Sequence, residues 1–487
     1  MDIYGKGNRQ AAWQEKVTRA ILAMDVGIIS RHSFRGGVHP PEKKDLTRDS
    51  EIQAGPAVKE VAVMLSQHIG AACRPLVRKG NMAQAGQKIG DSDAYVSAPV
   101  HSPITGQVKE IGLRSHAVLG RSAAIIIEAY PHDATRRSYS ELKEEIDERK
   151  YSAEQICEAV RQAGIVGMGG AGFPTRVKIE PNPQMPKEIL IINGCECEPY
   201  ITCDYRLMLE RTNLIIAGAK LARRASGCSQ VFVAIEDNKP AAIDAMEAAL
   251  QGPSGGTQAS LGGGIELAVV KTKYPQGGER QLINAVLKRQ VPTGGIPPMI
   301  GVLVVNVATA AAIAEAVVFD RPLTHRVVTV SGEAIARPGN YYVAVGTSVS
   351  DLIEFCGGVT QKSAKVVLGG PMMGIALADL DAPITKTSGA VTVLTKEQIG
   401  GAKFARRQTP CIHCGRCLEV CPENLNPTKI AHSVKYNLLD LAEKEYFINA
   451  CTECGCCSYV CPANIEVTGY IKTGKIFLAR QKKKMPQ

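Results

Sequence analysis

Apolar residues recur with a helical period just before a glycine-rich stretch of the chain. Ser152 and Gln155 have the spacing of a capping box, and the apolar face that follows stops at Gly164. That face consists of Ile156, Ala159 and Val160. Residues 187–193, KEILIIN, form a short apolar run of the kind that makes a buried strand. The pattern predicts a helix, a loop and a strand in succession, which is typical of an α/β domain.

Residues 301–319, GVLVVNVATAAAIAEAVVF, are the best candidate for a membrane span. They contain Asn306 and Glu315, whose polar side chains would be costly inside a bilayer. The stretch therefore predicts a buried strand that ends at Asn306 and a buried helix after it. We expect no transmembrane span.

Residues 76–112 predict short strands separated by turns. The turn residues include Gly80, Gly86, Pro99 and Gly106. The segment resembles the barrel-sandwich fold of lipoyl and biotinyl carriers, but a carrier needs a lysine at its hairpin tip and this tip reads HSPITG. We therefore expect a structural or docking role, with His101 and His116 at the surface or in turns.

Residues 327–395 begin VVTVSGEAIARPGNYYVAVGTSVSDLIEFCGGV, which predicts a second β-rich module. This segment resembles the β-grasp module that lies beside flavin domains. Its expected role is to pack such a domain against the C-terminal part of the chain. The stretch GGPMMG (369–374) either lines a cofactor or forms a plain turn.

The strongest chemical signal is a repeated cysteine motif near the C-terminus. CIHCGRCLEVCP (411–422) and CTECGCCSYVCP (451–462) both read C-x2-C-x2-C-x3-C-P. In this motif three thiolates bind one iron–sulfur cube and the cysteine before proline reaches the neighbouring cluster. One [4Fe–4S] cluster is thus predicted on Cys411, Cys414, Cys417 and Cys461, and a second on Cys451, Cys454, Cys457 and Cys421. Two zinc sites would not require the Cys-Pro pair in both copies.

Cys456 falls off the spacing of the motif and is expected to be a free thiol. The segment between the motifs keeps one apolar helical stripe. The stripe consists of Ile430, Val434, Leu438, Leu439 and Ala442. Together the motifs and the stripe predict a helical two-cluster ferredoxin domain, whose use is to relay single electrons.

Composition supports metal binding and disfavours nucleic acid. The 487 residues allow about three domains of usual size, and no secretory signal is visible at the N-terminus. Sixteen cysteines in such a chain point to metal ligands more than to disulfides. Aromatic residues are only 5%, which argues against base stacking. The formal charge of +10 falls to about +6 with two clusters of about −2 each, too weak a bias to imply nucleic acid.

The glycine-rich stretch 164–178, GIVGMGGAGFPTRVK, contains the spacing G-x-G-x-x-G at Gly167, Gly169 and Gly172. A dinucleotide fingerprint follows a strand and opens a helix, whereas this one follows a helix and runs into Phe-Pro-Thr. Taken alone, the stretch favours a tight structural turn. Its dinucleotide spacing is interpreted as a coincidence.

The surroundings of this stretch favour a phosphate-binding loop. The strand 187–193 is followed by GCECEPY, and a further glycine-acid loop, YPQGGER, lies at 274–280. Ligands of open α/β sheets bind at the carboxyl ends of the strands. Glycines let backbone N–H groups approach a phosphate, and Lys178 adds a positive charge.

These motifs together carry a family resemblance. GMGGAGFPTRVK, NGCECEPYITCDYR, YPQGGER and VVNVAT resemble the flavin domain of the NADH-oxidising subunit of respiratory complex I. With FRGGVHPPEKK at 34–44 and the two cluster motifs, the order of parts over residues 31–470 resembles the RnfC family of the Rnf electron-transport complex. This chain has Cys195 and Gly278 where the complex I relative carries acidic residues.

The resemblance implies a flavin site with a nicotinamide beside it. The implied FMN-binding residues are Gly167, Gly169, Gly170, Gly172, Lys178, Asn193, Gly277, Gly278, Asn306 and Thr309. NAD(H) is expected near Phe173, Glu196, Glu198 and Glu279. Cys195, Cys197 and Cys203 have a spacing that fits no cluster, and buried thiols are the favoured interpretation.

The expected fold is a multidomain α/β and β protein in five parts. These are an N-terminal extension (1–30), a barrel-sandwich module (31–135), a Rossmann-like FMN/NADH-binding domain (136–325), a β-grasp module (326–397) and a helical ferredoxin domain (398–487). The extension predicts a short amphipathic helix through Trp13 and Val17. The basic C-terminal tail is expected to be solvated, with contact to anionic lipid as the alternative.

The resemblance implies a peripheral subunit on the cytoplasmic side of the inner membrane. It would belong to an ion-translocating NAD:ferredoxin oxidoreductase, a translocase, and its partners would be the membrane and ferredoxin-like subunits of that complex. NADH would pass a hydride to FMN, and single electrons would go to the clusters, because hydride chemistry moves two electrons and each cube takes one. The alternatives are a soluble cobalamin reductase of a microcompartment, which lacks the HPPEKK module, and a non-catalytic docking subunit with clusters but no nucleotide.

Overall fold

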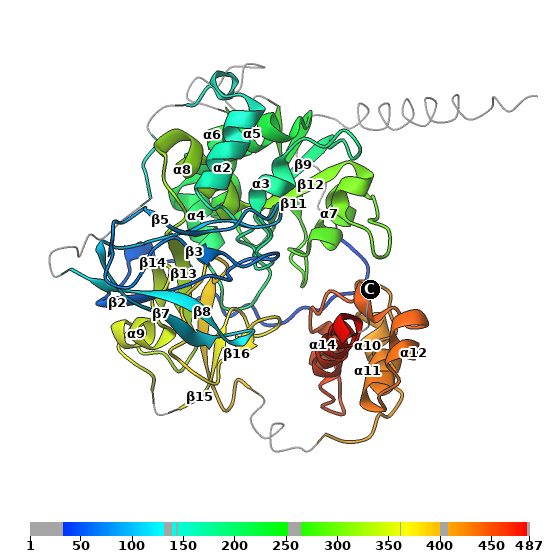
Figure 1. The fold of residues 1–487 in the computed structure, drawn as a ribbon. Helices are drawn as coiled ribbons and strands as arrows, with labels where there is room; N and C mark the ends of the chain where they lie inside the picture. Colours follow the sequence, from blue (N-terminus) through cyan, green and yellow to red (C-terminus); the bar gives the residue numbers. More distant parts are fainter. Residues whose placement is uncertain are drawn as a thin grey trace, which may run out of the picture.

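The computed structural model describes residues 33–130, 139–142, 145–251, 264–360, 362–399 and 408–484. These residues form two β-rich modules, an α/β domain and a helical C-terminal domain. In Figure 1 the α/β domain (green) lies above the β-rich modules (blue and yellow), and the helical domain (orange and red) lies at their side. The helix predicted through Trp13 lies outside the described residues.

The barrel-sandwich module consists of seven short strands in two sheets. The strands are β2 (Glu60–Met64), β3 (Arg74–Pro75), β4 (Met82–Ala83), β5 (Lys88–Asp91), β6 (Val100–His101), β7 (Gly106–His116) and β8 (Gly120–Ala129). One sheet has the order β2-β8-β7-β4 and the other β3-β5-β6. Alternate residues of β8, including Ile125 and Ile127, face the core between the sheets.

The α/β domain is built on a parallel sheet with helices on both faces. Its strands are β9 (Ile189–Asn193), β10 (Gln230–Glu236), β11 (Ile265–Val270) and β12 (Val302–Asn306), in the order β11-β10-β9-β12. Its helices are η1 (Glu148–Lys150), α2 (Ala153–Gln162), α3 (Thr175–Ile179), α4 (Cys203–Glu210), α5 (Thr212–Ser226), α6 (Pro240–Gln251), α7 (Glu279–Leu287), η2 (Pro297–Ile300) and α8 (Val307–Phe319). Leu190 and Ile192 pack on the α5 and α8 side, and Ile189 and Ile191 pack on the α7 side.

Several predicted elements of this domain are present as expected. The capping box of Ser152 and Gln155 starts α2, and residues 301–319 form β12 followed by α8. No described helix combines the length and the apolar character that crossing a membrane requires. One expectation is wrong, because the short helix α3 does begin right after Phe173 and Pro174.

The β-grasp module contains a six-stranded sheet, to which the front of the chain adds a strand. Its elements are β13 (His325–Ser331), β14 (Gly339–Ala344), α9 (Val349–Phe355), β15 (Ser363–Leu368), β16 (Ile375–Ala376) and β17 (Ala390–Thr395). The sheet order is β1-β14-β13-β17-β15-β16, where β1 (Ile52–Ala54) pairs parallel with β14. Residues 33–54 therefore lie outside the two sheets of the barrel-sandwich module, and their strand β1 belongs to the β-grasp sheet.

The helical domain repeats a short helix within each cysteine motif, α10 in the first and α13 in the second. Its elements are α10 (Arg416–Glu419), α11 (Pro427–Lys435), α12 (Leu439–Lys444), η4 (Ile448–Ala450), α13 (Cys456–Tyr459) and α14 (Val467–Lys484). The predicted single stripe is divided between α11 and α12, because Asn437 has a φ of 58° and Leu438 is exposed. The start of the basic tail continues α14 as a helix.

Candidate functional site

The carboxyl ends of β9 and β12 bring two asparagines side by side. Asn193 and Asn306 are paired in register. The Asn306 side chain accepts from the N–H groups of Ala308 and Thr309 at the start of α8, and its amide donates to Asp204 at 2.6 Å. The Asn193 amide donates to the carbonyl of Gly277 at 2.9 Å. Three loops that are far apart in the sequence thus meet at one edge of the sheet.

The glycine-rich loop lies against the same edge. The N–H of Met168 donates to the Thr309 hydroxyl at 2.9 Å, and a Cβ on Gly169 would lie 3.4 Å from the Cβ of Asn306. Gly170 has a φ of 109° and is exposed, and a Cβ there would meet nothing within 4 Å. The loop thus presents open backbone beside the start of a helix, which is a favourable place for a phosphate.

Lys178 and Glu279 form an ion pair at 2.6 Å, with side chains 28% and 37% exposed. Lys178 comes from α3, after the glycine-rich loop, and Glu279 begins α7, after the YPQGGER loop. This pair joins two of the segments from which the FMN and NAD(H) residues are predicted. Its partial exposure leaves both charges within reach of a bound ligand.

The loop after β9, residues 194–202, places its two glutamates in different surroundings. Glu196 is buried, and its carboxylate accepts from the N–H of Asp204 at 2.8 Å at the start of α4. Glu198 accepts from the N–H groups of Met372 and Met373 at 3.2 and 2.8 Å. Burial raises the pKa of Glu198 to about 7. The GGPMMG stretch is therefore held against this loop.

Cys195 and Cys197 in this loop, and Cys203 directly after it, are free thiols. Burial raises the pKa of Cys195, Cys197 and Cys203. The Cys197 sulfur accepts from the N–H of Gly277 at 3.3 Å. Carboxylate oxygens of Glu196 and Asp204 lie within 4.8 Å of the Cys203 sulfur, close enough to share a metal ion with it. However, the Glu196 carboxylate already accepts from the Asp204 N–H, and the Asp204 carboxylate accepts from the Asn306 amide. This arrangement agrees with the interpretation as buried thiols.

The two cysteine motifs repeat their backbone geometry. His413 and Glu453 occupy equivalent positions and have φ angles of 54° and 59°, and Gly415 and Gly455 have 78° and 84°. In the helix that follows each motif, a threonine hydroxyl lies beside a cysteine sulfur of that motif, which places two further hydrogen-bonding groups near the predicted ligands. These pairs are Cys417–Thr428 at 2.8 Å and Cys457–Thr468 at 3.4 Å.

The cysteine positions fit the predicted crossed ligand sets. One pocket is lined by all four members of the second set, Cys421, Cys451, Cys454 and Cys457. At the first set, the N–H of Thr409 donates to the carbonyl of Ala463 at 3.1 Å, which brings the start of the first motif beside the end of the second. The four-thiolate donor set suits an iron–sulfur cube.

The second set of cysteines lies against the loop that follows β11. The Tyr274 hydroxyl donates to the Cys454 carbonyl at 2.7 Å, and Tyr274 is three residues before Gly277. Arg280 forms an ion pair with Glu423 at 3.0 Å. In contrast, Cys414 of the first set is exposed. The two sets therefore differ in both neighbours and exposure.

The barrel-sandwich module lies against the glycine-rich stretch, through residues outside its hairpin tip. The buried Lys386 donates to the carbonyls of Pro99 and Gly164 at 2.6 and 2.7 Å, and the N–H of Ile69 donates to the Gly172 carbonyl at 3.0 Å. The expectation of a surface or turn position is wrong for His101, which is 5% exposed. Burial lowers the pKa of His101 to about 3.

Sequence reasoning missed three side chains at this site, of which Lys44 and Arg326 are buried and Asp204 is partly buried. Lys44 binds backbone carbonyls of loop 194–202, and Asp204 accepts from Asn306. Arg326 donates to the Met168 carbonyl at 3.3 Å, and its Nε and Nη1 have no hydrogen-bond partner within the described part of the chain. The HPPEKK stretch is the one available signal for Lys44, whereas the other two depend on long-range contacts. The partnerless guanidinium nitrogens and the open loop fit a phosphorylated flavin.

Four models of known protein families match the chain, one in each of the four parts of its fold. The models that match are the RnfC barrel sandwich hybrid domain at 32–131, the Nuo51 FMN-binding domain at 160–315, the SLBB domain at 327–376 and the 4Fe-4S dicluster domain at 407–465. The chain is therefore an iron–sulfur flavoprotein with an FMN-binding domain and a two-cluster domain.

Relatives of similar length identify the family more narrowly. The chain is 41% identical to the C-subunit of the proton-translocating ferredoxin:NAD(+) oxidoreductase complex of Clostridium ljungdahlii, over 85% of this chain and 87% of the relative. It is 38% identical to the C-subunit of the Na(+)-translocating complex of Acetobacterium woodii, over 85% and 90%. It is 39% identical to the C-subunit of the ion-translocating oxidoreductase complex of Rhodobacter capsulatus, over 85% and 77%. The chain belongs to this family, the RnfC family of Rnf complexes.

Among solved structures, the chain resembles one from an NAD+-reducing [NiFe]-hydrogenase in the air-oxidised state. The TM-score is 0.46 and the identity 20%, over 68% of this chain and 62% of that one.

Proposed function

We propose that the chain exchanges hydride with NAD(H) at a bound FMN and single electrons with two [4Fe–4S] clusters, as a peripheral subunit of an ion-translocating NAD:ferredoxin oxidoreductase. One observation carries this proposal: the loop that supplies Gly277 to the site at the sheet edge also supplies Tyr274, which bonds to Cys454. The same short loop thus touches the residues predicted to bind flavin and those predicted to bind a cluster.

The glycine-rich loop and the strand ends would hold the flavin. FMN when bound supplies the conversion between a two-electron hydride and single electrons. The open backbone at Gly169 and Gly170, beside the start of α8, would receive the phosphate. Asn193 and Asn306 would position the cofactor from the carboxyl ends of β9 and β12, together with Gly277, whose carbonyl accepts from Asn193, and Gly278 beside it.

The nicotinamide would approach between Phe173 and the partly exposed pair of Lys178 and Glu279. Phe173 ends the glycine-rich loop, and its partly buried ring would flank a planar ligand. Glu198 lies on the inner side of the same region, where its carboxylate holds the β-grasp loop in place. Glu196 would act on the site indirectly by positioning α4, because its carboxylate accepts a hydrogen bond from the Asp204 N–H at the start of that helix.

The positions of the two cysteine sets suit a relay from the flavin to another protein of the complex. The set of Cys421, Cys451, Cys454 and Cys457 contacts the flavin loop through Tyr274. The other set includes the exposed Cys414, which is accessible to another protein. Relatives are named as parts of complexes that translocate ions and use NAD(+) and ferredoxin, which supports a position at the membrane on the cytoplasmic side.

The test is an absorbance spectrum of anaerobically purified chain before and after NADH is added. We expect the flavin band to bleach and the broad cluster absorbance to fall afterwards. A flavin that stays oxidised with NADH but is reduced by dithionite would contradict the NAD(H) assignment. A purified chain with iron and sulfide but no flavin would favour the docking alternative.

A further inference from the structure

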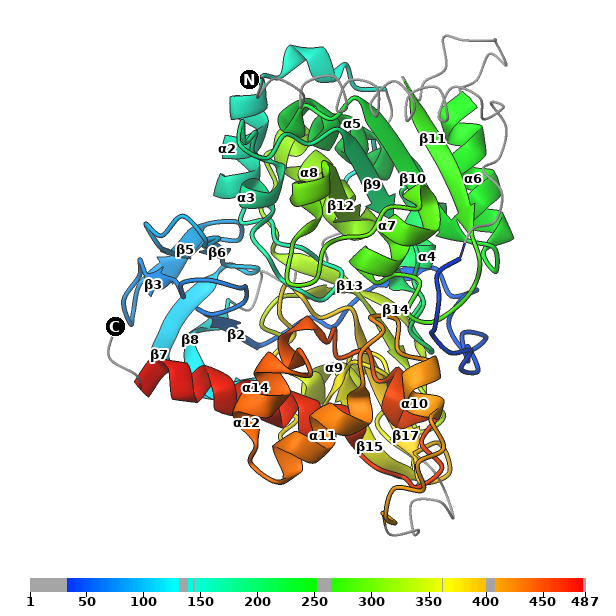
Figure 2. The ribbon, with the colours of Figure 1, turned by 90° about the vertical axis from the view of Figure 1, so that its right-hand side faces the viewer.

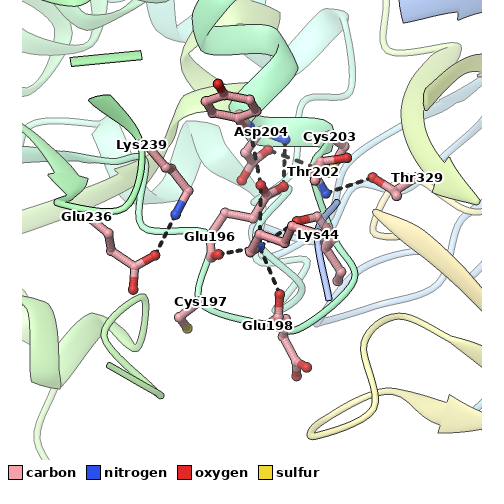
Figure 3. Close-up of polar contacts among 12 residues, drawn as sticks. Lys44, Glu196, Cys197, Glu198, Thr202, Cys203, Asp204, Glu236, Lys239 and Thr329 are labelled. Carbon is pink, nitrogen blue, oxygen red and sulfur yellow. Dashed lines mark hydrogen bonds and ion pairs between the residues drawn. The ribbon is translucent and has the colours of Figure 1, made fainter. Parts of the chain in front are cut away.

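Lys44, from the HPPEKK stretch, is buried at the carboxyl edge of the α/β sheet. Its side chain is 9% exposed, and its ammonium donates to the carbonyls of Glu196, Glu198 and Ile201 at 2.8, 3.0 and 2.5 Å. Figure 3 shows Lys44 at the centre of these contacts. An ammonium has three hydrogens, so each of them has an acceptor in one loop.

These carbonyls turn inward around Lys44, and the side chains of the same loop point to two other loops. Cys197 accepts from the N–H of Gly277, and Glu198 accepts from two N–H groups of the GGPMMG stretch. Loss of the ammonium would leave three carbonyls without their donor, which is costly for buried groups. The loop would then relax, and the contacts of both side chains would change with it.

The charges around Lys44 favour its retention in this position. The Glu196 carboxylate lies 3.8 Å from its ammonium, and a second buried pair, Lys239 and Glu236, lies nearby with its charged atoms 2.6 Å apart. Removal of one partner from a buried pair leaves an uncompensated charge. Glu196 would then lose its cation at the start of α4.

The rest of the front segment connects Lys44 to the helical domain. The N–H of Gly37 donates to the Val420 carbonyl at 2.8 Å, and Val38 and Tyr274 exchange two backbone hydrogen bonds. Figure 2 shows this segment in dark blue, passing between the α/β domain and the parts below it. Lys44 is thus held on a strap that also touches the residues before Cys421.

We propose that Lys44 is a positioning residue for the nicotinamide side of the flavin site. It holds loop 194–202 so that Cys197 keeps the YPQGGER loop in place and Glu198 keeps the GGPMMG stretch in place. This inference rests on the proposed function, because it assigns Lys44 to that same site. Lys44 contacts neither the glycine-rich loop nor Asn306 in the described hydrogen bonds, so that part of the FMN site should remain and the chain should still bind FMN, with an affinity reduced by any shift of Gly277.

The test compares Lys44→Met with Lys43→Met in the full chain. Lys43 is the adjacent residue and makes an exposed ion pair with Glu333, with side chains 50% and 48% exposed. We expect Lys44→Met to raise the KM for NADH at least about tenfold in ferricyanide reduction, with kcat within about twofold. Hydrogen exchange should also speed up in residues 194–206 and 369–374. Lys43→Met should leave both measurements unchanged.

Two results would overturn the inference. One is a Lys44→Met chain with wild-type exchange and KM. The other is loss of FMN and both cluster signals in Lys44→Met and also in Lys44→Gln, while Lys43→Met keeps them, because Lys44 would then be purely structural. A wild-type chain whose flavin is not reduced by NADH would contradict the proposed function, whereas the exchange comparison would still decide whether Lys44 holds the loop.

Discussion

At the scale of the residue, the loop after β9 shows how burial decides what a carboxylate does. Glu196 and Glu198 are two residues apart, yet one accepts from the start of α4 and the other from the GGPMMG stretch. Burial is the largest influence on Glu198 and raises its pKa to about 7, while the two N–H donors, Lys44 and Lys472 oppose this shift. Its ionisation therefore falls near neutral pH.

The raised pKa of Glu198 predicts a pH-dependent stability. Because the folded pKa exceeds the unfolded one, its stabilising contribution is complete below about pH 4.5 and is lost as the pH rises through about 7. We expect Glu198→Gln to remove this fall, which is on the order of 2 kcal/mol, from the free energy of unfolding between pH 5 and 8. Thermal unfolding at several pH values measures it.

Glu333→Gln is the control for this comparison, because Glu333 is an exposed glutamate of the β-grasp module. Its pH profile should match that of the wild type. A Glu198→Gln profile that is parallel to the wild type over the whole range would show that Glu198 does not titrate there.

At the scale of the element, the periodicity of apolar residues predicts those helices and strands whose formation depends on local sequence alone. The capping box of α2, the strand β9 and the strand–helix pair at 301–319 follow from apolar patterns and are present. The division of one stripe into α11 and α12 does not follow, because the left-handed Asn437 interrupts an apolar pattern that continues. The pairing of β1 with β14 joins residues nearly three hundred positions apart, so no local pattern contains it.

The candidate site is predictable to the same extent. Glycines and strand-end asparagines carry motifs, and the structure gathers them at one edge. Arg326 lies in no motif, and the HPPEKK motif does not indicate what Lys44 contacts, because the role of both residues depends on which carbonyls the folded chain brings to them. The ligands of the clusters are the part that the sequence predicts most directly, since the spacing of the motif itself follows from the geometry of the cube.

The loop after β11 predicts a strict requirement for glycine at position 277. A Cβ there would lie 2.3 Å from the Cys195 carbonyl, so the loop must shift in Gly277→Ala. We expect FMN affinity to fall at least about tenfold, a loss of about 1.4 kcal/mol, in fluorescence titrations of flavin-free chain. Gly469→Ala in α14 is the control, where the nearest atom is 3.5 Å from the new Cβ. Equal affinity in both variants would contradict the assignment of this loop to flavin.

The repeated threonines predict separate control of the two clusters. Thr428 lies beside Cys417 and Thr468 beside Cys457, and a hydroxyl that donates to a thiolate stabilises the more negative, reduced state. We expect Thr428→Val to lower the potential of one cluster by about 40 mV, which is about 1 kcal/mol for one electron. Thr468→Val should lower the other, by less because its contact is longer. Redox titrations followed by electron paramagnetic resonance measure both.

At the scale of the whole molecule, the modules are arranged around one line of contacts. The barrel-sandwich module contacts the glycine-rich loop, the front strap holds loop 194–202, and Tyr274 touches the cysteine set of Cys454. The other set includes the exposed Cys414. The barrel-sandwich module and the front strap thus each hold a loop that belongs to the proposed electron route.

This arrangement predicts that the two clusters are not equivalent. Cys454→Ala removes a predicted ligand of the cluster proposed beside the flavin loop, whereas Cys414→Ala removes a predicted ligand of the other, more exposed cluster. Both variants should keep FMN and about half of the iron, and NADH should bleach the flavin in both. In Cys414→Ala, NADH should still reduce the remaining cluster, because that cluster lies next to the flavin.

In Cys454→Ala the remaining cluster should be reduced by dithionite but at least about tenfold more slowly by NADH, because the cluster between it and the flavin is gone. Absorbance after rapid mixing gives the rates, and electron paramagnetic resonance identifies the cluster. The opposite pattern would reverse the order of the two clusters. Equal rates in the two variants would mean that the contact between Tyr274 and Cys454 does not mark the route.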